Sequence, residues 1–551
     1  MARLETLTLK GYRSVRDEVT IHFPTGMPLV FVGENNAGKS NVVRAIDLVL
    51  GEWYAGTREP EDHDFWDRNA ATGQIEIVAQ LADMETPDRR GNQVEGFYWS
   101  YDPQASEKCV FRARTFDGEA YVTNEMRDEC VCVVVGTDRR LSYQLSYTSK
   151  STLLSKLMRK FHTHLTEDQD RVDQLKQKFG ELTEIFSEVA EFAGFQSELS
   201  QQFCEMFGGM SHGLQIDFSA YDPSNFFQSL RVLPTEGNTI RTFEELGTGQ
   251  EQLLALAFAH AYAKAFHGGI ILAIEEPEAH LHPLAQKWLA RRIRKMATDG
   301  LQILVTTHSP AFVDILGLQG LVLVSKIDGA TTTKQLTSTD LSDFCIDHGA
   351  DHDRTSSETV LPFYAGSATQ EILAGLFAKK IVLVEGATES LALPIYLRKV
   401  GLDVTKEGIA IVPVMGKGNL AKWWRFFTAY GIPTFITFDN DRADDRNATK
   451  RKDALKALGV DDSEARRLTA TEDWLINDSA CVFGTDFEGT MRCSFARYRE
   501  LEGEARGSTG DSKPLTARFV AQKLALNTLD RGWTRIRELS EKLKALSGRG
   551  R

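Results

Sequence analysis

The 551-residue sequence lacks any apolar run that approaches the ~20 residues needed to cross a membrane. Its longest candidate, 253–263, is interrupted by His260 and followed by Lys264. The first residues, MARLETLTLKGYRSV, alternate like a strand and lack the apolar core of a signal peptide. Seven cysteines at irregular spacing do not suggest a disulfide framework. We therefore expect a cytoplasmic protein without membrane contact.

Net positive charge is also absent, because the formal net charge is -13. Non-specific nucleic-acid binding depends largely on lysine and arginine displacing counterions, so this balance argues mildly against it. Basic clusters at 446–456 and 535–551 fit solvated helix faces more readily than DNA contacts. Clustered charge and metals can still offset a negative whole, so DNA binding at a defined site remains open.

The composition, 42% hydrophobic and 26% charged, is that of a globular protein, and the length predicts about three domains. Alternating patterns predict strands in 4–23 and in 74–135. The apolar run 28–32 predicts a further strand, and 41–50 is expected to form a helix. The stretch 328–366 is poor in apolar residues and rich in Thr, Ser, Asp and Gly, which predicts a linker or a loosely packed connection.

A helical pattern begins at residue 151 and contains a short heptad repeat. Its apolar positions are spaced by three and four residues: Val172, Leu175, Phe179, Leu182, Phe186 and Val189. The run is shorter than a coiled coil normally needs. It therefore fits either an amphipathic helix that packs on its own domain or an inserted dimerisation arm.

The segment Gly33–Ser40, GENNAGKS, matches the phosphate-binding pattern GxxxxGKS and lies between an apolar strand and a helix. Glycines in such a loop let backbone N–H groups turn towards phosphates. Lys39 is expected to neutralise the β and γ oxygens, and Ser40 to ligate Mg2+. The predicted ATP ligands of this loop are Asn35, Asn36, Gly38, Lys39 and Ser40.

Three later elements decide the class of ATPase. The apolar strand 270–274 leads into Glu275 and Glu276, which we expect near Mg2+ and near the attacking water. A second strand, 301–305, leads to His308, which can contact a γ-phosphate. Upstream, 246–252 (LGTGQEQ) contains Gly247 and Gly249 in a turn that leads into an amphipathic helix.

In this order the elements resemble those of ABC ATPases, in the branch that contains the SMC and RecF proteins. In that branch a large insertion separates the nucleotide loop from the signature, here 246–252, which caps the ATP of a partner subunit. The resemblance therefore implies a homodimer. The signature departs from the usual pattern, with Gly247 where a serine often stands and Thr248 between the glycines.

A second set of chemistry-bearing residues follows short apolar runs in the C-terminal half. The strand 380–384 precedes Glu385 and a glycine turn, with Glu389 four residues later. The strand 435–438 delivers Asp439 and Asp441, which point the same way if the segment is extended. Oxygen ligands of this kind suit Mg2+ or Mn2+. The turn 416–418 would let a backbone approach the same edge.

Glutamate-glycine after one strand and DxD after a later one resemble a Toprim domain. Together with the N-terminal ATPase, they make the chain similar to the OLD (overcoming lysogenization defect) family of nucleases. The resemblance implies a two-metal site completed by a later acidic pair, Asp486 and Glu488, and a lysine near the scissile phosphate, Lys513. The late acidic pair and lysine resemble the class 2 members, some of which partner a UvrD-like helicase in phage defence.

The resemblance implies an α/β fold: an ABC-type ATPase domain with an inserted helical dimerisation arm, then a Toprim domain with a helical C-terminal extension. The expected boundaries are 1–150 and 213–366 for the ATPase with its linker, 151–212 for the insertion, 367–485 for Toprim and 486–551 for the extension. The expected activity is ATP-binding, metal-dependent cleavage or nicking of double-stranded DNA, in phage defence or DNA repair. Two alternatives remain: a topoisomerase-like enzyme using Tyr396, Tyr430 or Tyr498, and a RecF-like clamp or sensor that does not cut.

Overall fold

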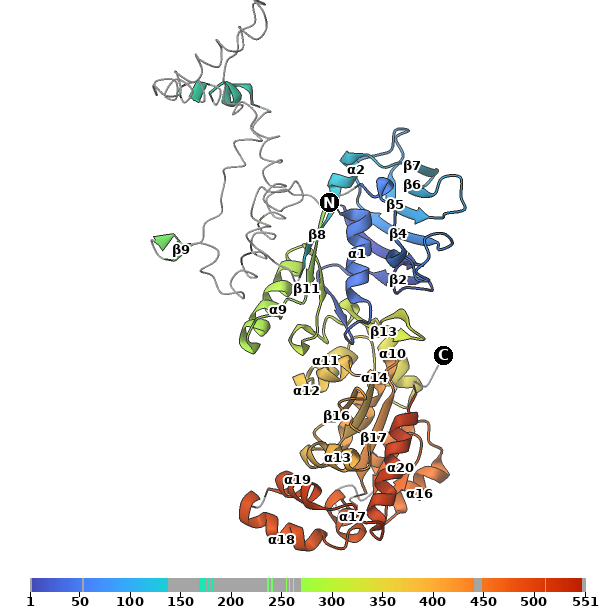
Figure 1. Cartoon of the computed structure of the whole chain (residues 1–551), viewed down its shortest axis with the longest axis vertical. Coiled ribbons are helices and arrows are strands. Elements are labelled where there is room, and N and C mark those ends of the chain that lie inside the picture. The colour runs from blue at the N-terminus through green and yellow to red at the C-terminus, as the bar shows by residue number, and fades with distance from the viewer. Residues whose placement is uncertain are drawn as a thin grey trace, which may run out of the picture. The chain divides into compact units, whose positions relative to one another are not determined.

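The computed structural model divides the chain into two units, Met1–Val134 with Gly268–Arg551, and Val135–His267. It describes residues 2–51, 54–136, 168–174, 177–178, 181, 235–236, 239–240, 254, 257, 261, 269–440, 448–510 and 512–547. Of the predicted heptad positions only Val172 is among them, and the predicted signature 246–252 contributes no described glycine. Both expectations therefore lie outside the described residues. The following account concerns the first unit (Figure 1).

The N-terminal lobe contains an antiparallel sheet with the order β2-β1-β4-β5-β6-β7. Its strands are β1 (Arg3–Lys10), β2 (Val19–His22), β4 (Ile75–Ala82), β5 (Val94–Tyr101), β6 (Cys109–Thr115) and β7 (Gly118–Tyr121). β4 alternates between buried and more exposed positions, as its sequence predicts. Helix α1 (Lys39–Leu50) contacts β4 and β5.

A second sheet carries the nucleotide loop and has the order β14-β13-β3-β12-β11-β8. Its strands are β3 (Leu29–Val32), β8 (Cys130–Val135), β11 (Gly269–Glu275), β12 (Gln302–Thr306), β13 (Leu321–Ile327) and β14 (Ala330–Gln335). β3 runs parallel to β12 and β13, and β12 runs parallel to β11, so these strands end at one edge. Helix α9 (Pro283–Thr298) packs against β12. Cys130 and Cys132 are buried in β8, as their strand pattern predicts.

The C-terminal sheet has the order β16-β15-β17-β19-β18. Its strands are β15 (Lys380–Val384), β16 (Ile409–Pro413), β17 (Thr434–Asp439), β18 (Leu475–Ile476) and β19 (Ala480–Phe483). β16, β15, β17 and β19 are parallel, and β18 is antiparallel to β19. The carboxyl ends of the parallel strands therefore meet at one edge, which is where this fold places a site.

Helices cover both faces of this sheet. One face shares a hydrophobic core with the helices α13 (Ala387–Lys399), α17 (Phe487–Ser494), α18 (Tyr498–Thr509), α19 (Lys513–Lys523) and α20 (Arg531–Ala545). Helix α14 (Leu420–Ala429), which is rich in aromatic residues, contacts β15 and β17 and is absent from that core. The helices after β19 thus belong to the same packed body as the sheet (Figure 1).

The expectation of a loose linker at 328–366 is wrong. This stretch contains β14, α10 (Ser338–Asp347) and α11 (Val360–Ala365). β14 pairs with β13 along its whole length, where β-branched threonines suit a sheet edge. Thr337 and Asp340 cap the start of α10 reciprocally. Polar composition misled the prediction because the residues act as caps and edge-strand positions.

The shorter elements complete the described fold. In the first unit they are α2 (Asn124–Glu129), α12 (Gln370–Leu373), α15 (Thr449–Ala457), α16 (Asp462–Ala470) and the 3-10 turns η1 (Ala55–Thr57), η2 (Asp62–Asp64), η5 (Pro310–Phe312), η6 (Leu318–Gly320), η7 (Ala374–Phe377) and η8 (Lys417–Asn419). The second unit contains the antiparallel pair of short strands β9 (Thr235–Glu236) and β10 (Thr239–Ile240). No helix in the described ranges has the length and apolar character of a membrane span.

Candidate functional site

The nucleotide loop connects β3 to α1 through backbone conformations that only glycine adopts easily. Gly33 has φ 134° and Gly38 has φ 111°. A Cβ atom at Gly33 would lie 2.0 Å from Val324 O, and one at Gly38 would lie 2.2 Å from Thr331 Oγ1. The glycines of the motif are therefore required both for the turn and for close packing against β13 and β14.

Lys39 is buried, with 6% of its surface exposed, and its ammonium group is held by the loop. Nζ donates to Gly33 O at 2.9 Å and to Glu34 O at 2.8 Å. Burial lowers the pKa of Lys39 to about 8, against the opposing effect of nearby carboxylates, of which Glu276 acts most strongly. An anion bound in the loop would favour the charged form of this lysine.

A cavity of about 330 Å³ elsewhere in the molecule is unrelated to these residues, but one of about 570 Å³ coincides with the loop. The lining residues of the larger cavity are Asn35, Asn36, Ala37, Gly38, Lys39, Ser40, Asn41, Glu276, Thr306 and His308. Residues predicted from separate motifs in the sequence thus converge on one space. Its polar lining and the loop geometry suit a nucleotide phosphate chain.

Glu276 lies directly beyond β11 with a backbone φ of 46°, which is uncommon for a residue with a side chain. Its N–H donates to Thr306 O at 2.8 Å and also to Thr306 Oγ1 at 3.3 Å. The side chain lies beside His308, with 3.8 Å between Glu276 Oε1 and His308 Nε2. The neighbouring strand thus holds Glu276 in a strained position, as is common at functional sites.

His308 lies beyond β12 and is positioned by Glu278, a residue that the sequence motifs did not single out. Glu278 accepts hydrogen bonds from His308 N at 2.5 Å and from Thr307 Oγ1 at 2.8 Å. Burial, with a contribution from Lys39, lowers the pKa of His308, which favours the neutral ring. The sequence does show Glu278 as a third acid shortly after Glu276. Its role could not be predicted, because it depends on hydrogen bonds from residues that follow the neighbouring strand.

Of the other residues predicted for the nucleotide site, one is described by the structure and two are not. Glu275 is the last residue of β11 and lies opposite Thr306 in the sheet register, next to Glu276. Gly247 and Gly249 lie outside the described residues. The assignments of Glu275 to Mg2+ and of the two glycines to a partner's ATP stay predictions.

The predicted acids of the C-terminal sheet meet at the carboxyl edge of its parallel strands. Glu385 follows β15, and Asp439 is the last residue of β17. The N–H group of Asp439 donates to Glu385 Oε1 at 2.7 Å. Glu389 lies in the first turn of α13 and is only 4% exposed. Three predicted ligands therefore come from adjacent elements at this edge, while Asp441 lies outside the described residues.

The electrostatics of these acids favour a cation. Burial, together with the charges of Glu389 and Glu385, raises the pKa of Asp439 to about 9. Burial, with contributions from Glu385 and Glu488, raises the pKa of Glu389 to about 7. Within the described residues, Asp439 Oδ1 is buried without a hydrogen-bond partner. A divalent cation would supply the missing partner and favour the ionised carboxylates, so the donor set fits Mg2+ or Mn2+.

The same region does not present a finished ligand set. Among the described residues, no three His, Cys, Asp or Glu side chains already converge in the manner of a metal-binding group. Asp441, the second acid of the DxD pattern, is not part of that comparison because it lies outside those residues. The fit to a cation therefore rests on the buried, partnerless oxygen of Asp439 and on the raised pKa values.

Asn440, between the two aspartates of the DxD pattern, anchors the backbone of this segment. Its side-chain Nδ2 donates to Leu468 O at 2.9 Å and to Thr471 O at 3.0 Å. The buried Arg451 donates to Asn440 Oδ1 at 2.7 Å. These contacts fix the chain directly after Asp439. These roles of Asn440 and Arg451 could not be predicted from the sequence, because they depend on packing between α15, α16 and β17.

The predicted acidic pair Asp486 and Glu488 lies at the start of α17, after the parallel strand β19. Asp486 caps this helix by accepting a hydrogen bond from Gly489 N. Glu488, in the first helical turn, acts electrostatically on Glu389. The pair is therefore at the edge that holds the other acids, but one oxygen of Asp486 also has a structural role.

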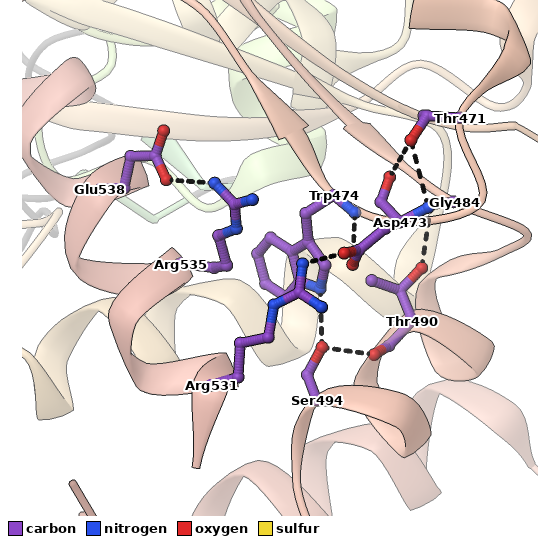
Figure 2. A network of polar contacts seen from close by, with 9 residues as sticks. All are labelled: Thr471, Asp473, Trp474, Gly484, Thr490, Ser494, Arg531, Arg535 and Glu538. Atoms are coloured by element: carbon purple, nitrogen blue, oxygen red, sulfur yellow. Dashed lines mark hydrogen bonds and ion pairs between the residues drawn. The ribbon is translucent and has the colours of Figure 1, made fainter. Parts of the chain in front are cut away.

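Figure 2 shows the polar contacts that hold α17 in place. Gly484 N, directly after β19, donates to Thr490 Oγ1 at 3.0 Å, and Ser494 Oγ donates to Thr490 O at 2.7 Å. Trp474 Nε1 donates to Ser494 Oγ at 2.9 Å. At the start of α20, Arg531 pairs with Asp473. The acidic pair is thus carried by a helix that is fixed to the strand before it.

Lys513 is exposed at the first turn of α19, which packs along α13. Near the other end of these helices, Lys399 Nζ donates to Gln522 O at 2.8 Å and also to Leu524 O. The C-terminal ends of α13 and α19 therefore lie together. Because the helices pack along one another in this direction, Lys513 lies towards the end of the pair that holds Glu389. Its contact with a phosphate stays a prediction.

Residues near β15 also contact the nucleotide loop and the tip of β12. Lys379 Nζ lies 3.8 Å from Glu34 Oε2, and the rings of Phe377 and His308 have centroids 6.4 Å apart. The ion pair is largely exposed, so it contributes little stability. It nevertheless joins the segment before β15 to the loop that holds Lys39.

Comparison with protein-family models gives three matches, two to ATPase models and one to a TOPRIM model. Residues 376–441 match the TOPRIM domain described as overcoming lysogenization defect protein-like. Residues 132–313 match an AAA ATPase domain, and residues 6–208 match a further AAA domain. The ATPase and TOPRIM matches correspond to the two sheets that hold Lys39 and Asp439.

Two curated relatives extend over most of the chain. An OLD nuclease of Thermus scotoductus is 27% identical over 82% of this chain and 86% of its own length. The Old nuclease of Escherichia phage P2 is 21% identical over 82% of this chain and 80% of its own length. Among solved structures, an Smc head domain from Pyrococcus furiosus aligns with a TM-score of 0.36 and 18% identity, over 61% of this chain and 96% of that chain. The domain matches and the two relatives support an OLD-family nuclease, to which the chain is similar over most of its length.

Proposed function

We propose that the protein is an ATPase and a divalent-metal-dependent endonuclease or nickase that acts on double-stranded DNA. The observation that carries the nuclease assignment is the buried Asp439 Oδ1, which has no hydrogen-bond partner among the described residues and lies near Glu385 and Glu389 at the carboxyl edge of parallel strands. The two relatives that align with 82% of the chain are both named nucleases, which supports the same assignment. ATP use is supported by the glycine loop that holds Lys39 and by its cavity with Glu276 and His308.

At the nucleotide site, each described residue has a distinct task. Lys39 would neutralise the β- and γ-phosphates, and Ser40 would hold Mg2+. Glu276, fixed by Thr306 beside His308, would orient and deprotonate the attacking water. The neutral ring of His308 can donate a hydrogen bond from its N–H group to a γ-phosphate oxygen without adding a charge.

At the nuclease site, Glu385, Glu389 and Asp439 would hold Mg2+ or Mn2+, with Asp441, Asp486 and Glu488 completing the proposed set. Bound divalent metals supply activation of water and stabilisation of the leaving oxygen in this class of chemistry. Asp439 and Glu389 must lose their protons to serve as ligands, which burial and the neighbouring carboxylates oppose until a cation is present. Lys513 would stabilise negative charge on the scissile phosphate.

The proposed partners follow from the two sites and the family. Double-stranded DNA is the proposed substrate, and a second copy of the chain is proposed to complete each ATP site through its signature loop. A UvrD-like helicase is a further proposed partner, with a role in phage defence or DNA repair and class 2 membership within the family. ATP and DNA meet in the cytoplasm, which is the proposed location.

The decisive experiment incubates supercoiled plasmid with the wild-type protein and Mg2+ or Mn2+, with and without ATP. Metal-dependent conversion to nicked or linear DNA, lost in Asp439→Ala, supports the proposal. Intact plasmid under every condition contradicts it. Light scattering with and without ATP tests the homodimer in parallel, and a monomer in both conditions contradicts that part.

The topoisomerase alternative is less compatible with the described residues. Tyr396, Tyr430 and Tyr498 are each at most 2% exposed, and burial raises the pKa of all three hydroxyl groups. A buried phenol cannot attack a DNA phosphate without a large rearrangement. Religation of the nicked plasmid by the protein would nevertheless favour this alternative. DNA binding without cleavage would favour the clamp alternative.

A further inference from the structure

A short glycine loop after β16 lies beside the acids at the carboxyl edge of β15. The N–H group of Gly416 donates to Glu385 O at 2.9 Å, so the loop is attached directly to the backbone of a proposed metal ligand. Asn419 Nδ2 donates to Val414 O at 2.8 Å and closes the loop on itself. Gly416 has φ 117°, and Met415 has φ 58°. These contacts give the residue that follows Gly416 a defined place next to Glu385.

That residue, Lys417, directs its ammonium group at the acids. Its side chain is 9% exposed, and Nζ lies 3.6 Å from Glu385 Oε1. The same carboxylate oxygen accepts the hydrogen bond from Asp439 N. The positive charge of Lys417 lowers the pKa of Asp439, against the larger effects of burial and of Glu389 and Glu385. Lys417 therefore acts electrostatically on two proposed metal ligands.

The partner of Lys417 distinguishes it from three other lysines of this domain that are buried or half-buried. Lys422 Nζ donates to Phe363 O and to Ser367 Oγ, and Lys380 and Lys399 donate to carbonyl groups at the ends of helices. Those lysines join elements of the fold through uncharged groups. Lys417 instead pairs with a carboxylate that a divalent cation would occupy, so metal binding would remove its partner.

The loop also leaves open space beside its two glycines, on either side of Lys417 in the sequence. A Cβ atom added at Gly416 or at Gly418 would meet no atom within 4 Å among the described residues. Met415 is 65% exposed on the same loop. A phosphodiester strand can therefore approach the loop without displacing side chains at the two glycines. Backbone phosphates are the anions that lysine contacts most generally in DNA complexes.

We propose that Lys417 is a phosphate-binding residue of the nuclease site, paired with Glu385 until that carboxylate ligates metal and then directed to a phosphate oxygen of the DNA. The inference rests on the proposed nuclease function and adds a residue to it. Lysine suits this exchange because its charge lies at the end of a flexible four-carbon chain. Two cations competing for Glu385 repel one another, whereas the phosphate offers the displaced ammonium a new counter-charge.

The test compares Lys417→Met with Lys406→Met in the full-length protein. Lys406 is an exposed lysine before β16, at the opposite end of the strand that precedes Lys417, so its replacement removes the same charge from the same domain. Mn2+ binding is measured without DNA by electron paramagnetic resonance, and plasmid cleavage is measured in single turnover. We expect Lys417→Met to bind Mn2+ roughly five- to tenfold more tightly and to cleave roughly 100-fold more slowly. Lys406→Met should match the wild-type protein in both measurements.

Tighter Mn2+ binding together with slower cleavage would distinguish phosphate binding from a structural role of Lys417. A damaged site would lose metal affinity and cleavage together, and that result would overturn the inference. Wild-type cleavage by Lys417→Met would overturn it while leaving the nuclease function intact. An uncut plasmid with the wild-type protein would instead contradict the nuclease function itself. Lys417→Gln replaces the methionine variant if the latter does not fold, and Lys417→Arg should restore part of the cleavage because it keeps the charge.

Discussion

At the nucleotide loop a buried lysine lies among backbone carbonyl groups, whereas at the edge of the C-terminal sheet buried carboxylates lie beside one another. Burial lowers the pKa of Lys39 to about 8 and raises the pKa of Asp439 to about 9. The charged form is thus disfavoured at both sites, but the charges have opposite signs. An anion would relieve the first imbalance and a cation the second.

This comparison shows that the direction of a pKa shift carries information about the ligand that each site suits. Structural ion pairs can produce similar shifts, so geometry must agree with them. At Lys39 the agreement comes from the glycine turn and the cavity shared with Glu276 and His308. At Asp439 it comes from the convergence of parallel strands and from an oxygen without a described partner.

The largest expected effect separates the two sites completely. Asp439→Ala removes an acid that the proposed metals require, so plasmid cleavage should fall by roughly two to four orders of magnitude. ATP turnover should persist, because Asp439 ends β17 in the C-terminal sheet, whereas Lys39 begins α1 after a strand of the other sheet. Lys39→Ala should show the reverse pattern, with weakened ATP binding, lost turnover and at least some cleavage in Mn2+.

Both variants are assayed for plasmid cleavage and for phosphate release from ATP, with circular dichroism as the folding control. Wild-type cleavage by Asp439→Ala would mean that the metal site lies elsewhere. Loss of both activities in a folded Asp439→Ala protein would show that the sites do not function separately.

A second prediction divides binding from catalysis within the nucleotide site. Glu276→Gln should reduce ATP turnover by roughly 100-fold or more, because an amide cannot accept the proton of the attacking water. ATP binding should persist, since Lys39 and its loop remain intact. Equilibrium binding of a fluorescent ATP analogue, compared with Lys39→Ala, measures the difference. Full turnover by Glu276→Gln would reject its catalytic role.

A third prediction uses the pH dependence of stability. The pKa of Glu389 is raised to about 7 and that of Asp439 to about 9, so these groups bind protons more tightly in the folded chain than in the unfolded chain. Their stabilising contribution without metal is complete below about pH 4 and is lost as the pH rises through the folded values. The increase in melting temperature caused by Mg2+ should therefore be larger at pH 8 than at pH 6.

Differential scanning fluorimetry with Mg2+ or with a chelator measures this trend. Lys39 stays protonated below about pH 7 in both the folded and unfolded chains, so this lysine contributes little to the pH dependence there. Asp439→Asn, which removes one of the titrating groups, should reduce the pH dependence. An equal Mg2+ effect at both pH values in the wild-type protein would contradict the electrostatic account.

The smallest expected effect distinguishes the two roles of Asp486. Asp486→Ala removes the cap of α17 and should lower the free energy of unfolding by about 1 kcal/mol. Asp486→Ser keeps a side-chain oxygen for Gly489 N and should retain most of that stability. If Asp486 is also a metal ligand, both variants should lose cleavage. Full cleavage by a stable Asp486→Ser protein would leave Asp486 with its capping role alone.

The features that could be predicted from the sequence are local ones. The glycine loop, the strand before Glu275 and the strands before Glu385 and Asp439 all occur close to their predicted places. Each is marked by a short apolar run next to residues with special chemistry. The family resemblance placed Asp486 at the edge that also holds Glu389, although Asp486 was not expected to cap a helix.

The features that could not be predicted depend on contacts between distant segments. Glu278 acquires its role from the backbone of His308, and Arg451 from the buried side chain of Asn440. The sequence predicts a close approach of the backbone at the glycine turn around Lys417. The direction of the lysine side chain could not be predicted, because it depends on the pairing of β16 with β15. In the stretch after Asp328, threonines fill an edge strand rather than a loose linker.

The strand β15 separates a residue that contacts the nucleotide loop from a proposed ligand of the metal site. Lys379 immediately precedes β15, and Glu385 immediately follows it. At ~3.3 Å per residue, an extended segment of this length spans roughly 20 Å. Hydrogen bonding to strands on both sides prevents β15 from stretching or coiling. The strand is therefore a rigid connection. The residue before it contacts the nucleotide loop, and the residue after it is a proposed metal ligand of the nuclease site.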